Sequence, residues 1–391
     1  MENFSYYSPT EFVFGHGVEK EVGKLAAKYG ASKVLIVYGK GSVVRSGLLD
    51  RVKRVLEEEQ LPYVELGGVQ ANPEVMKVRE GIALSRQEGP NMVLALGGGS
   101  VIDTAKAIAI GHYYEGDFWD FYTGKAVPAQ ALKVATVLTI PAAGSEGSGN
   151  SVITDEQQQK KLSIRQPDLL RPVFSIMNPE LTMTLPPFQT ACGISDMMAH
   201  IMERYFSNTR DVSLTDRLCE ALLLSITETA PRVMSNPRDY EARANIMWAG
   251  TQAHIGMCGV GREEDWGSHF IEHEFSALDP SIAHGAGLSV VYPAWLTYAS
   301  RTNPQKIAQM AERVFGVRPS ADAKVMALEG IDRLKEFFRS LGLPTTLREL
   351  TTTPPDLDLV NANLHQNKGE VFGSYIKLNR EESREVLELC K

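Results

Sequence analysis

A change of pattern between residues 176 and 187 constrains the fold more than any other feature of this chain. From residue 11 to residue 176, short apolar runs alternate with helical periodicity. Beyond Asn178-Pro179 and Pro186-Pro187 the periodicity is helical, with almost no strand signal. Alternating strands and helices predict a doubly wound parallel sheet. The 391 residues also exceed what one core usually fills. We therefore predict a Rossmann-like α/β domain over 1–185 and an all-α domain over 186–391.

Individual elements follow from the same patterns. In the first half we expect strands at 11–14, 33–38, 62–66, 92–96 and 135–140, helices at 19–29, 48–60, 75–88 and 101–110, and a hairpin formed by 152–154 and 162–164. In the second half we expect helices at 188–206, 215–229, 241–255, 268–277, 285–300, 304–315 and 321–341. A last helix follows Asn379, which suits an N-cap.

Charge and composition exclude several classes of function. The net charge is −8, the isoelectric point is about 5.6 and no basic run is present, which argues against nucleic acid and an anionic membrane surface as partners. No segment reaches the ~18 apolar residues of a membrane span, and we recognise no signal peptide. The four scattered cysteines form no Cys-x-x-Cys pair, which favours a reducing, cytoplasmic setting.

Histidines and one acid recur at helical spacing in the second half. His269 and His273 are four residues apart, so they share one face of a helix. Pro280 is expected to break that helix, and His284 follows the break. Upstream, Asp196 and His200 are also four apart. Imidazole and carboxylate ligands suit iron or zinc, so this set predicts a divalent metal site. A single pair of this kind is more often structural; His254 we interpret as a core or helix-end residue.

A glycine turn in the first half is a candidate phosphate site. Gly97-Gly98-Gly99-Ser100 joins a predicted strand to a predicted helix, where free backbone N–H groups favour phosphate. Asp103, one turn later, could reach a ribose or nicotinamide group, and Lys106 is interpreted as a solvated helix residue. The turn lacks the usual G-x-G-x-x-G pattern, and a plain strand–helix turn is the alternative.

Two further loops are relevant to the cofactor. Gly39, Lys40 and Ser42 follow the strand at 33–38, where a carboxylate would pair with a ribose 2′-hydroxyl. A lysine there instead favours NADP over NAD, although Lys40 could simply be exposed. The loop over 141–149 could form one wall of the cofactor site or be a flexible surface loop.

The chain resembles the iron-dependent (group III) alcohol dehydrogenases over nearly its whole length, and is most similar to their NADP(H)-dependent butanol dehydrogenase and aldehyde reductase branch. The motifs that carry the resemblance are Asn3-Phe4 with Pro9-Thr10 and Phe14-Gly15, the run from Gly97 to Asp103, Pro141 to Glu146, Asp196 to His200, and Asp265-Trp266 through His284-Gly285. This family has the dehydroquinate synthase-like fold, so the resemblance implies the two-domain architecture predicted above.

The resemblance also implies roles for individual residues. It implies that Asp196, His200, His269 and His284 are the metal ligands and that His273 lies beside the nicotinamide. It implies a pyrophosphate loop at Gly97–Ser100, with Ser42, Thr139 and Lys161 at positions that contact NADP. It implies a homodimer, in which the strand near Phe12 could cross to the partner.

We therefore expect a metal-dependent alcohol dehydrogenase or aldehyde reductase that transfers hydride between NADP(H) and a primary alcohol/aldehyde pair. The alternatives are another metal enzyme of the same fold, such as a polyol dehydrogenase, or a metal-dependent hydrolase or lyase. A hydrolase or lyase would not need three glycine-containing loops on a Rossmann-like sheet.

Overall fold

The computed structural model describes residues 1–391 and divides into two compact units. Tyr7–Thr184 form the sheet unit, and Leu185–Lys391 together with Met1–Tyr6 form the helical unit. The first six residues are therefore grouped with the helical unit and not with the sheet that follows them. No helix combines the length and mean hydropathy that crossing a lipid bilayer requires.

The sheet unit contains a six-stranded parallel sheet in the order β1-β8-β5-β4-β2-β3. Its strands are β1 (Glu11–Phe14), β2 (Val34–Gly39), β3 (Tyr63–Val69), β4 (Met92–Gly97), β5 (Lys133–Leu138) and β8 (Phe174–Met177). The helices are α1 (Val22–Lys28), α2 (Ser42–Arg45), α3 (Leu48–Glu58), α4 (Val75–Glu88), α5 (Gly99–Gly111), α6 (Trp119–Tyr122) and α7 (Pro167–Leu170). The 3₁₀ turns Val18–Glu21 and Pro179–Thr182 complete the unit.

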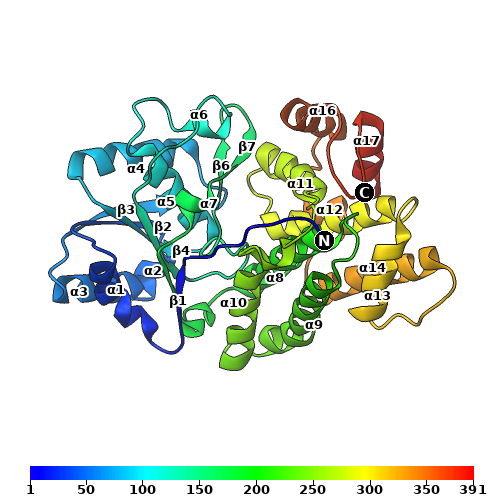
Figure 1. Ribbon diagram of the computed structural model, residues 1–391, viewed down its shortest axis with the longest axis horizontal. Coiled ribbons are helices and arrows are strands. Elements are labelled where there is room, and N and C mark those ends of the chain that lie inside the picture. The colour runs from blue at the N-terminus through cyan, green and yellow to red at the C-terminus, as the bar shows by residue number, and fades with distance from the viewer. The chain divides into compact units, whose positions relative to one another are not determined.

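Helices cover both faces of this sheet, which explains why its strands read as continuous apolar runs. One face packs against α1 and α3, and α4 and α5 lie on the other (Figure 1). The chain runs from β2 outward to β3, then returns to place β4 on the opposite side of β2. The order of strands therefore reverses between β2 and β4, where ligands bind to doubly wound sheets.

A separate antiparallel hairpin, β6 (Asn150–Asp155) and β7 (Lys160–Arg165), follows the sheet's fifth strand. The predicted hairpin is thus confirmed, as are the alternating elements and the parallel sheet. The fifth strand begins two residues earlier than predicted and ends at Leu138, so Thr139 and Ile140 belong to the loop.

The helical unit contains α8 (Pro187–Tyr205), α9 (Ser213–Ser235), α10 (Tyr240–His254), α11 (Gly267–Leu278), α12 (His284–Ala299), α13 (Pro304–Arg313), α14 (Ala323–Ser340), α15 (Leu347–Leu350), α16 (Leu357–Lys368) and α17 (Arg380–Leu389), with a 3₁₀ turn at Met257–Gly259. It has no strand. Its core is one large apolar cluster to which α8 and α12 contribute along almost their whole lengths. The helices α13 and α14 pack side by side (Figure 1).

Three helices of this unit differ from the sequence-based prediction, which also lacked the short α15. The prediction missed α16, whose sequence contains three asparagines and a histidine, all poor helix formers. Asp356 caps this helix, and contacts with α11 and α17 stabilise it. Helix α9 was predicted to end at Thr229 but continues to Ser235, with Pro231 inside it.

Candidate metal centre and dinucleotide site

The helical unit brings together the acid and the histidines that the sequence singled out. Helix α8 carries Asp196 and His200, and α11 carries His269 and His273 one turn apart. Helix α11 ends at Leu278, and His284 is the first residue of α12. The ring centroids of His269 and His284 are 5.1 Å apart, and those of His200 and His269 are 4.5 Å apart. Asp196, His200 and His269 are each at most 5% exposed.

A close approach of two helices places His284 in this group. A Cβ atom on Gly285 would overlap the backbone carbonyl of Cys192, one turn before Asp196 on α8. Only glycine lets the start of α12 approach α8 this closely. The result is a distance of 3.7 Å between His284 Nε2 and Asp196 Oδ1.

Asp196, His200 and His269 offer ligand atoms that all lie within 4.8 Å of one another, and Glu272, His273 and His284 form a second such group beside them. His269 Nε2 lies 3.8 Å from Asp196 Oδ1, comparable with the His284 distance. Ligand atoms about 2.1 Å from one tetrahedral ion are about 3.4 Å apart. Both Asp196 Oδ1 and His269 Nε2 are buried without a hydrogen-bond partner, which is costly unless something else binds them. These residues therefore fit a divalent metal.

The electrostatics of the cluster also favour a cation. Burial disfavours the ionised carboxylate, but the neighbouring rings of His200, His269 and His284 outweigh it and hold the pKa of Asp196 well below its usual range. Burial likewise disfavours a charged His269, but Glu203 and Asp196 outweigh it and raise the pKa of this histidine to about 9. In the metal-free chain a second proton on His269 thus supplies part of the positive charge that the buried carboxylates Asp196 and Glu203 favour.

Two glutamates that the sequence analysis missed contact the cluster directly. Glu203 Oε2 lies 2.6 Å from His269 Nδ1, and Glu272 Oε2 bonds to His284 Nδ1. The sequence did contain a signal for Glu203: it follows Asp196 by seven residues, so the two side chains share one face of the helix. His254, predicted to be a core or helix-end residue, is buried with its ring 4.5 Å from that of His200.

The sheet unit collects the predicted dinucleotide residues at one edge of the sheet. Gly39 ends β2 and Lys40 follows it, Ser42 begins α2, Gly97–Ser100 span the end of β4 and the start of α5, and Thr139 follows β5. These three strands are neighbours and parallel, so their carboxyl ends lie at the same edge. Thr139 donates its N–H to the carbonyl of Gly97 (3.0 Å). The fold therefore places all three loops beside the reversal of strand order.

The glycine turn also leaves room for a ligand. A Cβ atom added to Gly99, the first residue of α5, would meet no protein atom within 4 Å. The open space faces the start of a 13-residue helix, whose first N–H groups suit a phosphate. The remaining predicted cofactor residues bond within the chain: Lys40 Nζ to Gln70 (2.8 Å), and the largely buried Lys161 to Asn72 (3.2 Å).

Asp103 and Lys106 bind the loop over 141–149 and its continuation into β6. The Asp103 carboxylate accepts from Ser145 Oγ (2.6 Å) and from the N–H of Val152 (2.9 Å). Lys106 was predicted to be solvated, but it is fully buried. Its Nζ donates to the carbonyls of Ser145, Ser148 and Asn150 at 2.7–2.8 Å. Burial lowers the pKa of Lys106 to about 8. The loop is therefore fixed and mostly buried, not a flexible surface loop.

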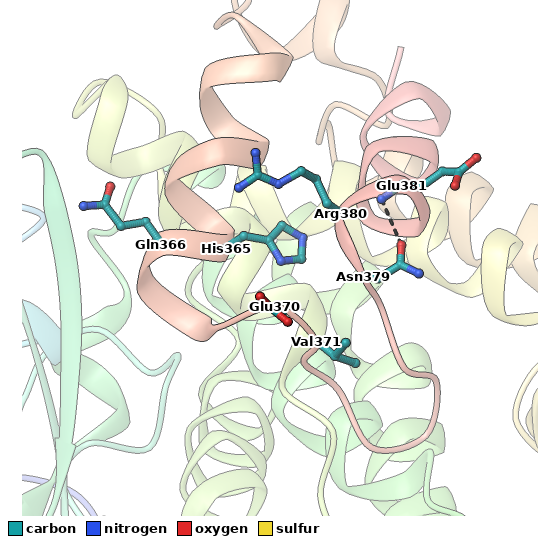
Figure 2. Close-up of a pocket in the computed structure, with 7 residues that line it drawn as sticks. All are labelled: His365, Gln366, Glu370, Val371, Asn379, Arg380 and Glu381. Atoms are coloured by element: carbon teal, nitrogen blue, oxygen red, sulfur yellow. Dashed lines mark hydrogen bonds between the residues drawn. The ribbon is translucent and has the colours of Figure 1, made fainter.

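A cavity of about 630 Å³ lies in the helical unit, away from the cluster residues. Figure 2 shows it between the end of α16 and the start of α17, with Gln366 pointing away from the other side chains. His365 there has both ring nitrogens bonded, to the carbonyl of Gly369 and to Ser383 Oγ. This cavity therefore offers no free imidazole for catalysis or metal binding.

Both halves of the chain match sequence profiles of known proteins. The sequence profile of iron-containing alcohol dehydrogenases matches residues 9–179, and the profile of the family's C-terminal domain matches residues 190–390. The chain belongs to the iron-containing alcohol dehydrogenase family. The family resemblance seen in the sequence is thus confirmed, together with the fold class.

Several members of this family are similar over the full length of the chain. A probable NADH-dependent butanol dehydrogenase of Bacillus subtilis is 40% identical over 99% of both chains. The NADPH-dependent aldehyde reductase YqhD of Escherichia coli is 32% identical over 100% of both chains. A crystal structure of NADH-dependent butanol dehydrogenase A from Thermotoga maritima has a TM-score of 0.95 and 38% identity, covering 100% of this chain and 99% of that one. The enzyme is an alcohol dehydrogenase or aldehyde reductase that uses a divalent metal and a nicotinamide cofactor.

Proposed function

We propose that this enzyme reduces aldehydes to primary alcohols with NADPH, and catalyses the reverse reaction, at a metal site formed by Asp196, His200, His269 and His284. One observation carries the proposal: an acid and three histidines from three helices converge, with Asp196 Oδ1 and His269 Nε2 buried and lacking hydrogen-bond partners. Relatives named butanol dehydrogenase and aldehyde reductase support this class of substrate.

Each residue would contribute a defined step. A divalent ion at this site supplies a Lewis acid that polarises the substrate's carbonyl oxygen. His273 lies on the same face of α11 as His269, with its ring centroid 5.4 Å from that of His284. During reduction it would hold the proton that the product oxygen receives. The burial of Asp196 and His269 excludes water from the ligand atoms.

The sheet unit would bind the dinucleotide through its three loops. We propose that Gly97, Gly98, Gly99 and Ser100 hold the pyrophosphate, and that Gly39, Lys40, Ser42, Thr139 and Lys161 contact the rest of the cofactor. The carboxylate of Asp103 is already bonded to the 141–149 loop and to β6, so we propose that it shapes the site.

The preference for NADP(H) is part of this proposal. The strand β2 ends at Gly39 and Lys40 follows it, without the carboxylate that would repel a 2′-phosphate. The named relatives include both NADH- and NADPH-dependent enzymes. The choice between NADP(H) and NAD(H) therefore depends on whether Lys40 exchanges its hydrogen bond to Gln70 for a contact with the cofactor's 2′-phosphate.

A panel of aldehydes and alcohols tests the proposal directly. The protein is stripped of metal, reloaded with Fe²⁺ or Zn²⁺, and assayed with NADPH and NADH. We expect reduction of straight-chain aldehydes only after reloading, with a higher kcat/KM for NADPH. The His269→Ala variant serves as the inactive control. Equal activity in stripped and reloaded enzyme would contradict the metal site, and a preference for NADH would contradict the cofactor assignment.

We also propose a homodimer in a reducing, cytoplasmic compartment. The strand β1 is an edge strand paired with β8, and edge strands readily pair with a second chain. All four cysteines are free. Light scattering coupled to size-exclusion chromatography tests the dimer, which a mass near 43.1 kDa would contradict.

A further inference from the structure

Two histidines of the cluster each lie against a buried glutamate. Glu203 on α8 contacts Nδ1 of His269 at 2.6 Å, and Glu272 on α11 contacts Nδ1 of His284. The two glutamates are 1% and 0% exposed. Because an ionised carboxylate only accepts hydrogen bonds, each ring carries its proton on Nδ1. Nε2 is then the ring nitrogen left for a metal, and at His269 a bound metal takes the place of the second proton that the ring carries in the metal-free chain.

The glutamates are themselves fixed in place. Glu203 Oε1 accepts from Ser268 Oγ (2.6 Å) and from the N–H of His269 (3.1 Å), so it satisfies an otherwise unbonded N–H group at the start of α11. Glu272 Oε1 accepts from Ser276 Oγ at 2.8 Å. Gly287 makes room for it, since a Cβ there would lie 2.7 Å from Glu272 Oε1.

The third histidine is supported differently. His200 Nδ1 lies 2.9 Å from the backbone oxygen of Asp196 on its own helix. A divalent ion whose only anionic ligand is Asp196 keeps a net charge of +1. The two glutamates add two negative charges in a buried region, where uncompensated charge is costly. The cluster is therefore most stable with a divalent cation bound.

We propose that Glu203 and Glu272 are positioning residues that hold the metal in this enzyme. Each fixes the orientation and tautomer of one histidine, and their charge opposes release of the ion. The inference rests on the metal site of the proposed function. Removing a carboxylate that supports a metal-bound histidine typically weakens metal binding by about 10- to 100-fold.

The test compares three glutamate-to-glutamine variants of the full chain. Glu203→Gln and Glu272→Gln remove one charge each and keep the side chain's volume. Glu274→Gln is the matched control, because Glu274 is also on α11, is 2% exposed and accepts a hydrogen bond from Asn367 (2.9 Å). Affinity for Zn²⁺ and Co²⁺ is measured by competition with a chelator, together with the rate of release and the visible spectrum of the Co²⁺ form.

We expect the first two variants to bind both metals about 10- to 100-fold more weakly, with faster release and an altered Co²⁺ spectrum. The control should stay within about twofold of the wild type. Glu203 also caps α11, so circular dichroism and thermal unfolding monitor folding in every variant. Gly287→Ala, which displaces Glu272 without changing its charge, should shift the Co²⁺ spectrum in the same direction.

The possible outcomes distinguish failure of this inference from failure of the proposed function. Wild-type affinity and spectrum in Glu272→Gln would overturn the inference while leaving the metal site intact. Metal binding by the wild type without dehydrogenase activity would overturn the proposed function and leave this inference standing. A wild type that binds no metal would overturn both.

Discussion

The 141–149 loop of the sheet unit is held by a buried lysine together with Asp103, whereas the histidine cluster of the helical unit is bordered by buried glutamates alone. In the loop one lysine, Lys106, donates to three backbone carbonyls. In the cluster the carboxylates of two glutamates lie against Nδ1 atoms of imidazole rings. The backbone of a loop offers carbonyl oxygens, which accept hydrogen bonds from a cation such as a lysine. A histidine that binds a metal through Nε2 has Nδ1 left as a donor, so an anion such as a glutamate can fix the orientation of its ring. This difference is consistent with the ligands proposed for the two regions, a phosphate at the helix N–H groups beside the loop and a cation in the cluster.

The largest effect should come from removing a ligand of the cluster. His269→Ala should lose bound metal and lower kcat by more than about 100-fold, because losing a supporting carboxylate alone costs about 10- to 100-fold in metal binding or activity. Metal content by atomic emission and aldehyde reduction are measured on the same sample. Dinucleotide binding, followed by fluorescence, should be unchanged. A variant that keeps its metal would break the assignment of the cluster.

Removing the metal instead of a ligand should affect one unit selectively. A ligand present at about 1,000 times its Kd stabilises the folded state by about 4 kcal/mol. Chelation should therefore speed hydrogen exchange in α8, α11 and the start of α12, and NADP⁺ should slow it in α5. Mass spectrometry of exchanged peptides measures both. Equal changes in both units would contradict the separate roles given to them.

Lys106→Met should destabilise the sheet unit by about 2–4 kcal/mol, because three buried carbonyls lose a charged donor. The KM for the dinucleotide should rise, since the loop beside the glycine turn loosens. Lys133 is the control: its Nζ donates to one carbonyl, that of Tyr29 (2.7 Å), in an exposed position. Urea unfolding followed by circular dichroism compares the two variants. Similar losses in Lys106→Met and Lys133→Met would show that burial of the lysine is unimportant.

The smallest effect concerns the cofactor's 2′-phosphate. Lys40→Gln should raise the KM for NADPH by about 5- to 20-fold, which corresponds to losing one charged contact of about 1–2 kcal/mol. The KM for NADH should change by less than about twofold. Steady-state kinetics with saturating aldehyde measure both constants. A parallel loss with both cofactors would assign Lys40 a role other than phosphate binding.

The sequence predicted the fold well where local patterns agree with tertiary packing. The strand–helix alternation up to residue 176 predicted the parallel sheet, and Pro280 predicted the break that places His284 at the start of a helix. The helix α16 was missed because Asn361, Asn363 and Asn367 have low helix propensity. In this case the cap at Asp356 and tertiary packing outweigh propensity.

The buried charges were harder to predict than the helices that carry them. Lysine and glutamate are usually exposed, so Lys106, Glu203 and Glu272 were not singled out as structural residues. A signal for Lys106 was nevertheless present, since every other residue of α5 from Ala105 to Ile110 is apolar, and helices that are apolar all around are buried. For Glu203 and Glu272 the spacing shows a shared helix face, but which ring nitrogen each contacts depends on side-chain rotamers.

The dependence of the α11 amino-terminus on Glu203 has a consequence for how the enzyme matures during translation. Asp196, His200 and Glu203 leave the ribosome well before Ser268 and His269, so the glutamate must wait for the amide it caps. Docking of α11 and alignment of the His269 ring are then one event. Iron or zinc captured by the nascent polypeptide before residue 284 emerges would meet an incomplete set of the proposed donors, so the proposed site can form only after that point of translation.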